Sequence, residues 1–265
     1  MAAVEDIRRW FHFEEPPGVG VWPVPYTQQG LQKDCTRLVV FMLDEAPAVA
    51  AAAARVSREV MSALGGAGMP CFTVARSSYH VTVFFLSLPT DPVSDPQTSQ
   101  SKSLSPALVE SPSLALSSKK GKQSAFSPDH AREERSIDDA CRGLARGPVE
   151  LEVDRIVMAA SGTLLMLFRD PSGCLAPLRG ALRETFPGAP AKQTNIAHCT
   201  LLRAFPDPDA ESGVVLDPRV VEDVNAACVR WSARLQGAKV RLDRAWLVRE
   251  ERFSSLDGPK ESFKL

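Results

Sequence analysis

The chain has 265 residues, 44% of them hydrophobic and 24% charged, and its formal net charge is −1 at pH 7. A chain of this length and composition can bury a sizeable core, as one large domain or as two smaller lobes. Because a charge this close to zero exerts no global attraction on nucleic acids or acidic membranes, it favours a local site for a small anionic ligand over binding along a long polymer.

The six cysteines are scattered and form no CxxC pair. This distribution argues against a zinc ribbon and is typical of reduced thiols in an intracellular protein. No apolar run is long enough to cross a bilayer, and the first residues, MAAVEDIRRWF, lack the apolar core of a signal peptide. We therefore expect a cytoplasmic or nuclear location and no membrane contact.

Residues 1–35, which include EEPPGVGVWPVP, predict an irregular extension that packs through its tryptophans on a domain spanning 36–265. The domain opens with TRLVVFML at 36–43, which predicts a strand. The alanine-rich stretch after Asp44 predicts a helix that ends at Gly65 and Gly66. The next predicted strand, YHVTVFFL at 79–86, carries a histidine and a threonine two positions apart.

The composition changes sharply after this strand. Serine, proline and charged residues dominate to about residue 135, with almost no aromatic side chains. Such a segment buries too little apolar surface to offset the entropy lost on ordering, so we predict a disordered insert over about 89–135. Its SSKKGK run is interpreted as solvated charge, with a phosphorylation-regulated or nuclear-import element as the alternative. The insert is also a candidate lid, or a docking segment for a protein partner.

The elements after the insert repeat those before it. SIDDACRGLARG predicts a helix that begins at Ser136 and leads to a strand at 149–158. A strand at 163–168 and a helix with Leu178, Ala181, Leu182 and Phe186 on one face come next, stopped by Pro187 and Gly188. The strand of AHCTLLRAF follows, at 197–205.

The chain ends with the counterparts of the helix and strand that follow the first histidine strand. Asp217 and Pro218 open a helix, whose apolar face is predicted to consist of Val221, Val224, Cys228, Trp231 and Leu235. It leads to a strand predicted at 240–248. Two Asp-Arg pairs, 154–155 and 243–244, fall at equivalent places in the two halves.

This order occurs twice: strand, helix, histidine strand, helix, strand. Asp154 lies 74 residues after His80 and Asp243 lies 45 residues after His198, so the first half has a surplus of 29 residues, which the insert explains. The repeat predicts an α+β fold, bilobal and duplicated, with lobes at 36–158 and 159–265. We expect two antiparallel sheets with flanking helices around a central cleft, related by a pseudo-two-fold axis.

Both histidine strands carry the pattern H-x-T. Residues i and i+2 of a strand point to one face, so His80 and Thr82 share a face, as do His198 and Thr200. A pseudo-two-fold axis would bring these four side chains into one cleft. Two imidazoles with pKa values near neutrality suit phosphodiester cleavage, because one accepts a proton from the attacking oxygen while the other donates one to the leaving oxygen. The hydroxyls can donate to the non-bridging oxygens, and no metal or cofactor is required.

A lone H-x-T strand is common, and its histidine is usually satisfied by a backbone carbonyl. The duplication at equivalent points of a repeat is what favours a catalytic pair. His12 and His130 lack this context and are expected to be surface residues. The chain contains no GxSxG, GxxxxGK[ST] or HExxH motif, which argues against the corresponding hydrolase, nucleotide-loop and metalloprotease sites.

The motifs HVTV and HCTL resemble the two H-h-[TS]-h motifs of the two-histidine (2H) phosphoesterase superfamily, which includes RNA ligase-like proteins and cyclic phosphodiesterases. The resemblance covers residues 36–88 and 137–265. It implies a bilobal fold with a central groove and metal-independent hydrolysis of 2′,3′-cyclic phosphates, or of related 2′–5′ or cyclic phosphodiester linkages in nucleotides or RNA ends.

The resemblance also assigns roles to single residues. His80 and His198 match the catalytic histidines, while Thr82 and Thr200 match the phosphate-holding hydroxyls. Arg203 stands where family members often have a basic residue, so it would steady an anionic substrate or form a surface salt bridge. Tyr79 is a candidate for stacking on a base at the rim, or else a core aromatic. The insert and the extension depart from the family's compact domain.

Two functions from different classes remain. In the first, the chain is a phosphodiesterase used in RNA or nucleotide processing. In the second, the same fold is a non-catalytic nucleotide- or RNA-binding module that acts as a scaffold through its insert and extension. The intact pair of histidines and pair of threonines favours the enzyme.

Overall fold

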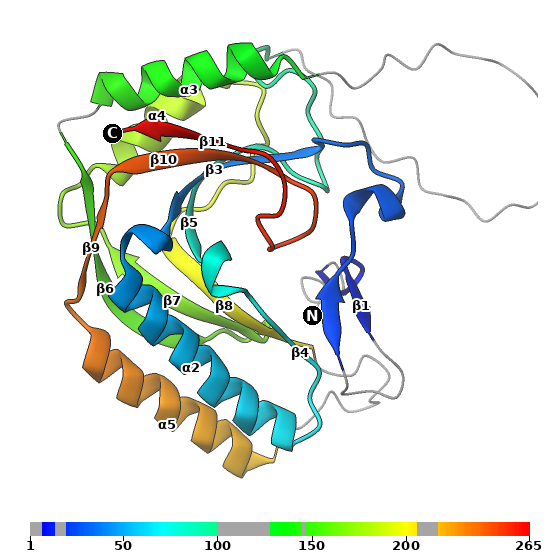
Figure 1. The fold of residues 1–265 in the computed structure, drawn as a ribbon, viewed down its shortest axis with the longest axis vertical. Coiled ribbons are helices and arrows are strands. Elements are labelled where there is room, and N and C mark those ends of the chain that lie inside the picture. The colour runs from blue at the N-terminus through cyan, green and yellow to red at the C-terminus, as the bar shows by residue number, and fades with distance from the viewer. Residues whose placement is uncertain (1–6, 14–19, 100–127, 145–146, 206–216) are drawn as a thin grey trace, which may run out of the picture.

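The computed structural model describes residues 7–13, 20–99, 128–144, 147–205 and 217–265. Two sheets, in which every pairing is antiparallel, form the centre of the molecule (Figure 1). The first sheet contains, in spatial order, β11 (Lys260–Lys264), β10 (Arg244–Glu250), β3 (Thr36–Met42) and β5 (His80–Ser87). The second contains, in spatial order, β4 (Cys71–Thr73), β8 (Ala197–Ala204), β7 (Thr163–Arg169), β6 (Val149–Met158) and β9 (Lys239–Leu242). The predicted α+β class is confirmed.

The spatial order of the strands shows the duplication. The row β5-β3-β10-β11 corresponds to the row β8-β7-β6-β9, and the histidine strands occupy matching places. The last strand of each half, however, joins the sheet of the other half: β6 pairs with β7, and β10 pairs with β3. The boundary predicted between residues 158 and 159 therefore does not coincide with the division into sheets.

The single strand predicted at 240–248 is two strands. The chain changes sheets at Asp243: β9 pairs with β6, whereas β10 pairs with β3. The backbone N–H of Asp243 leaves the ladder and donates to Oε2 of Glu45 at 2.6 Å. In β6 the register shifts between Val153 and Arg155, around Asp154. Both Asp-Arg pairs thus mark an irregularity of the strands, a register shift at Asp154 and a change of partner strand at Asp243.

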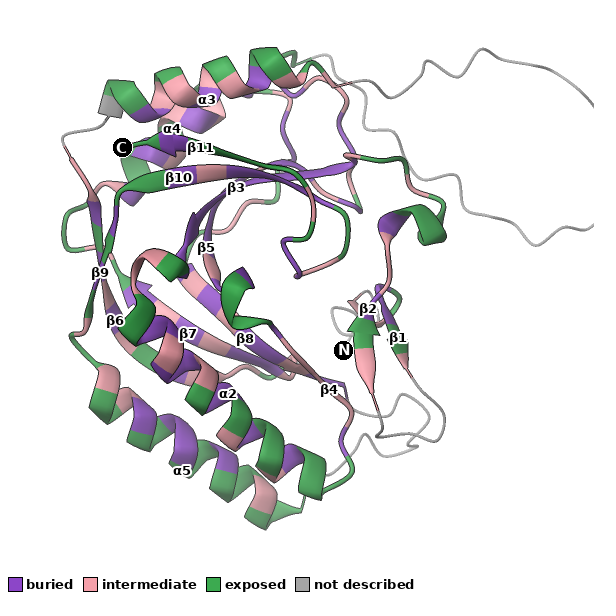
Figure 2. Ribbon diagram, viewed as in Figure 1, coloured by how far each residue is buried: buried purple, intermediate pink, exposed green. Residues whose placement is uncertain are grey.

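Two helices cover the outer face of each sheet (Figures 1 and 2). They are α2 (Pro47–Gly66) and α5 (Pro218–Leu235) at the second sheet, and α3 (His130–Leu144) and α4 (Leu175–Thr185) at the first. Asp217 caps α5 as predicted, since its side chain accepts a hydrogen bond from the N–H of Arg219 at 2.9 Å. Of the apolar face predicted for α5, Val224, Cys228 and Trp231 are buried, together with Ala227, whereas Val221 is 40% exposed, contrary to prediction.

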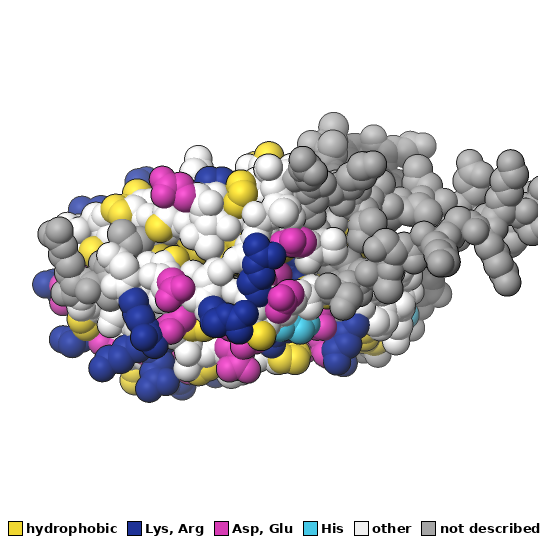
Figure 3. Space-filling view, turned by 90° about the horizontal axis from the view of Figure 1, so that it is seen from above, with side chains coloured by type: hydrophobic (Ala, Val, Ile, Leu, Met, Phe, Trp, Pro, Cys, Tyr) yellow, Lys and Arg dark blue, Asp and Glu magenta, His cyan; other side chains and the backbone are white. Residues whose placement is uncertain are grey.

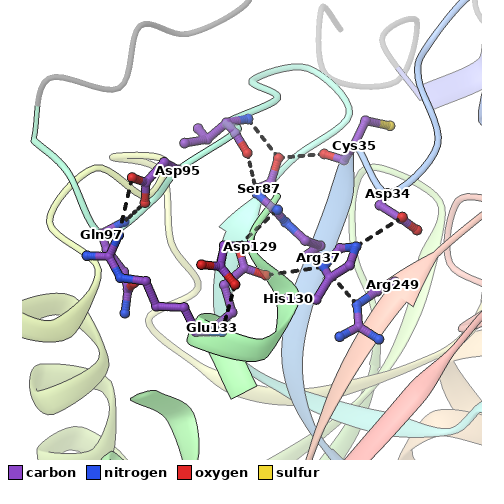
Figure 4. A network of polar contacts seen from close by, with 12 residues as sticks. Asp34, Cys35, Arg37, Ser87, Asp95, Gln97, Asp129, His130, Glu133 and Arg249 are labelled. Atoms are coloured by element: carbon purple, nitrogen blue, oxygen red, sulfur yellow. Dashed lines mark hydrogen bonds and ion pairs between the residues drawn. The ribbon is translucent and has the colours of Figure 1, made fainter. Parts of the chain in front are cut away.

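Both ends of the predicted insert are ordered, which corrects the prediction over 89–135. Helix α3 begins at His130, six residues before the predicted start at Ser136. The buried guanidinium of Arg37 donates to the carbonyl of Val93 and lies 2.9 Å from a carboxylate oxygen of Glu133 (Figure 4). A buried cation needs partners, and these come from the two ends of the insert. Residues 100–127, including SSKKGK, lie outside the described ranges.

The extension is also more regular than predicted. Strands β1 (Phe11–Phe13) and β2 (Val21–Pro23) form an antiparallel pair. Trp10 is 4% exposed and packs with Phe11, Tyr26, Cys35 and Phe205 in a second hydrophobic cluster. Trp22, in contrast, is 41% exposed, so only one of the two tryptophans in the extension anchors it.

All six cysteines are free. No helix in the described ranges has the length and hydrophobicity that a bilayer crossing needs. On the face shown in Figure 3, basic and acidic side chains lie next to one another, in line with the small net charge.

Candidate active site

The two histidines begin the two equivalent strands. Strand β5 opens with His80, which pairs with Met42, and the second residue of β8 is His198, which pairs with Leu167. The starts of the strands are close together, since the backbone of His80 lies against the thiol of Cys199 and the charge of one imidazole acts on the other. The two H-x-T strands therefore lie next to each other at their starts, as predicted.

A bulge in each strand decides which later residue reaches the histidine face. In β8 the register shifts after Thr200, so that Leu201 and Leu202 are both buried and Arg203 returns to the side of His198 and Thr200. Strict alternation would have placed residue 203 on the opposite face. In β5 the corresponding shift follows Thr82, and it places Phe85 at the position that Arg203 has in β8. The duplicated site thus has one cationic side and one aromatic side.

Arg179, on α4, joins the two histidine strands. Its Nη2 donates to the carbonyls of Thr82, at 3.1 Å, and of Ile196, at 3.0 Å, while its Nε donates to the carbonyl of Val83 at 3.1 Å. One guanidinium thereby donates hydrogen bonds to the carbonyls at the bulge of β5 and to the carbonyl two positions before His198. Sequence reasoning missed this residue, because only the packing of α4 brings it to the strands.

Replacing Arg179 by alanine is expected to lower the free energy of unfolding by about 2 kcal/mol, because two partly buried carbonyls and an exposed one lose a charged donor. Urea unfolding followed by circular dichroism measures this difference. Arg142→Ala is the control, since that side chain is 74% exposed and pairs only with Asp138 on the same helix. Equal stability of the two variants would show that Arg179 does not hold the strands.

His80 is partly buried and held in one tautomer. Its Nδ1 lies 2.8 Å from the carbonyl of Ser78, which can only accept, so Nδ1 carries the proton of the neutral ring and Nε2 keeps its lone pair. The pKa of His80 is lowered to about 4, mainly by burial and in part by the charges of His198, Arg203 and Lys260, while the hydrogen bond to Ser78 opposes the shift. The unliganded site therefore holds a neutral imidazole with Nε2 available as a base.

His198 lacks the same anchor. Its Nδ1 is buried and makes no hydrogen bond within the described part of the chain, although the nearby carbonyl of Ile196 favours the protonated ring. Burial lowers the pKa of His198, and the charges of Arg203 and Arg179 add to the lowering. An anion bound between the histidines would oppose this effect and favour the imidazolium.

Arg203 is a cation held beside both histidines. Its Nη1 donates to Oγ1 of Thr163 at 3.3 Å, its Nη2 donates to Oγ of Ser254 at 3.1 Å, and its guanidinium lies 5.2 Å from the centre of the Phe253 ring. Burial lowers the pKa of Arg203 to about 10, so the group stays charged at neutral pH. Its Nε is buried and has no hydrogen-bond partner among the described residues.

Two expectations about other residues need correction. Tyr79 is 1% exposed and lies in the main core, where burial raises its pKa to about 12, so its ring cannot stack on a ligand at a rim. His130 is not a simple surface residue: its Nε2 lies 3.3 Å from Oδ2 of Asp34, and its Nδ1 accepts from Nε of Arg249 at 3.1 Å (Figure 4). His12 is exposed, as expected.

Among the residues that the structure describes, no group of three or more His, Cys, Asp or Glu side chains is arranged to hold a metal ion.

Comparison with known proteins gives few matches. No protein-family model matches the chain, and no curated protein matches its sequence. Among solved structures, that of Usb1 from Kluyveromyces marxianus aligns with 88% of this chain and 99% of its own, with a TM-score of 0.48 and 12% identity. The same protein with uridine monophosphate aligns over the same shares, with a TM-score of 0.47 and 11% identity. At this identity no function is carried over from these structures.

Proposed function

We propose that this chain is a phosphodiesterase that hydrolyses 2′,3′-cyclic phosphates or related phosphodiester linkages of nucleotides or RNA ends by two-histidine acid–base catalysis. The observation that carries the proposal is the juxtaposition of His80 and His198 on equivalent strands, with Arg203 turned to the same side by a bulge. A single histidine strand would not support it.

The tautomer of His80 suggests the division of roles. Its Nε2 has the lone pair and accepts a proton from water while the water oxygen forms a bond to phosphorus. His198, protonated once the anionic substrate is bound, donates its proton to the ribose oxygen as the P–O bond breaks. The products are a ribose hydroxyl and a phosphate monoester, and the histidines exchange protonation states, which solvent restores.

Thr82, Thr200 and Arg203 are proposed to bind the phosphate. The threonines share the face of the histidines, and their hydroxyls can donate to non-bridging oxygens. Negative charge on these oxygens grows in the transition state, so a fixed cation beside them lowers the barrier. The charged guanidinium of Arg203 supplies such a cation.

The proposal predicts a bell-shaped pH profile on the acidic side of neutrality. In the free enzyme the active form has His80 neutral and His198 charged. Because the pKa of His80 is lowered to about 4 and that of His198 is lowered from its ordinary value of 6.5, kcat/KM should be greatest in a range that begins at about pH 4 and ends at the lowered pKa of His198, below 6.5. It should fall above this range as His198 loses its proton. The profile of kcat should extend to higher pH, since bound phosphate raises both pKa values.

The test measures turnover of the four nucleoside 2′,3′-cyclic phosphates in EDTA across this pH range, with the product linkage identified by chromatography. Turnover with a bell-shaped profile supports the proposal. A flat profile between pH 4 and 8 would contradict two-histidine catalysis. Saturable nucleotide binding without any turnover would instead favour the binding module.

A further inference from the structure

A pocket of ≈ 590 Å³ lies on the N-terminal extension, apart from the histidines. It is enclosed by β1, β2, the turn at Tyr26–Gln29 and the loop that follows β10. Among the residues that the structure describes, His12, Trp22, Gln28, Gln29 and Arg252 contribute polar or aromatic side chains to its lining, and none of the lining residues is acidic. The pocket therefore combines aromatic rings, amides and one cation.

Trp22 presents an exposed aromatic face in this pocket. It is 41% exposed, while Trp10 in the same extension is 4% exposed. The ring centres of Trp22 and His12 are 4.7 Å apart at an angle of 33°, so the imidazole supports the indole from the neighbouring strand. A tryptophan held in this way is a ready platform for a flat ring, because little side-chain entropy remains to be lost on stacking.

The platform is fixed to the loop after β10. The N–H of Tyr26 donates to the carbonyl of Glu251 at 2.9 Å, and Pro25 forms a β-bridge with Arg252. Arg252 pairs with Asp257 at 3.8 Å, and both side chains are about half exposed, so the pair is weak and the guanidinium remains available.

The same loop connects the pocket to the proposed phosphate site. Phe253 and Ser254 follow Arg252 directly, and they are the residues that hold the guanidinium of Arg203. One short loop thus places Arg252 in the pocket and places Phe253 and Ser254 against Arg203.

We propose that this pocket binds a base of a single-stranded RNA, one or a few nucleotides from the phosphate held at the histidines, with the base stacked on Trp22 and a backbone phosphate near Arg252. The inference rests on the proposed function and refines its substrate class to an RNA end. The cation and the two glutamine amides favour this ligand over an apolar peptide, since they match phosphate and the hydrogen-bonding edge of a base.

The test compares the wild type and Trp22→Ala on uridine 2′,3′-cyclic phosphate and on a hexauridylate that ends in a 2′,3′-cyclic phosphate. We expect Trp22→Ala to lower kcat/KM on the hexamer about tenfold and to leave the mononucleotide unchanged, because only the hexamer reaches the pocket. Arg252→Gln should lower kcat/KM on the hexamer but not on the mononucleotide. It should also reduce the dependence of hexamer kcat/KM on salt concentration. Val229→Ala, at a 70% exposed residue of α5, is the control.

Fluorescence anisotropy with a labelled hexauridylate that ends in a 3′-phosphate separates binding from turnover. Equal kcat/KM of wild type and Trp22→Ala on the hexamer, or equal losses on both substrates, would overturn the inference. If neither substrate is turned over but hexamer binding still depends on Trp22, the proposed hydrolysis fails and the pocket assignment stands. Binding that is independent of Trp22 would overturn the pocket assignment.

Discussion

Replacing His80 or His198 by alanine should lower kcat on a nucleoside 2′,3′-cyclic phosphate by about 10²–10⁴-fold, because each variant removes one of the two proton transfers. KM should change less, since Arg203 and the threonines still contact the phosphate. Initial rates at saturating substrate, at the pH optimum of the wild type, measure the effect. The double variant should be about as slow as either single variant, because the two groups act as a unit.

Two controls make this result specific to the imidazoles. Arg142→Ala, at an exposed position of α3, should keep the wild-type rate. The melting temperature of each histidine variant should show that the fold persists at the assay temperature. Retention of the wild-type rate by either histidine variant would contradict the proposed roles, even if nucleotide still binds.

Replacing Glu133 by alanine should lower the free energy of unfolding by about 3 kcal/mol, because it removes one partner of a buried ion pair. The two side chains are 0% and 3% exposed and lie 2.9 Å apart. Burial lowers the pKa of Arg37 and raises that of Glu133 to about 7, so the interior disfavours both charges. Chemical denaturation with a two-state analysis measures the loss.

Matched variants separate the ion pair from the helix that carries it. Asp138→Ala, which breaks the exposed pair with Arg142 on the same helix, should cost less than about 1 kcal/mol. The double variant Arg37→Met with Glu133→Leu should recover most of the stability, because apolar side chains of similar size fill the space. Equal losses in Glu133→Ala and Asp138→Ala would show that the buried pair contributes little.

The ion pair lies far from the chemistry along the strands. In the pairing of β3 with β5, Arg37 is opposite Ser87, whereas Met42 is opposite His80. The Glu133 variants are therefore expected to change stability and to leave kcat of the folded enzyme near the wild-type value. The described ends of the insert contact the first sheet at Arg37, through Val93 and Glu133.

Features that depend on neighbours in the sequence could be predicted. The strands at 36–43 and 163–168, the helix opened by Asp217 and the shared face of His80 and Thr82 follow from side-chain periodicity and capping, which act over a few residues. The duplication could be predicted as well, because the two halves repeat the same elements in the same order. The α+β class and the meeting of the two H-x-T strands followed from it.

Long-range pairing decided the remaining features. The exchange of β6 and β10 between the sheets, and the bulge that turns Arg203 toward His198, depend on a partner strand far away in the chain. Composition placed Glu133 in the predicted disordered insert, yet this carboxylate is buried against the guanidinium of Arg37. The sequence alone thus determined the repeated elements and the two histidine motifs. Only the tertiary structure decided which charges surround them, because burial and strand register are set by contacts that no local pattern encodes.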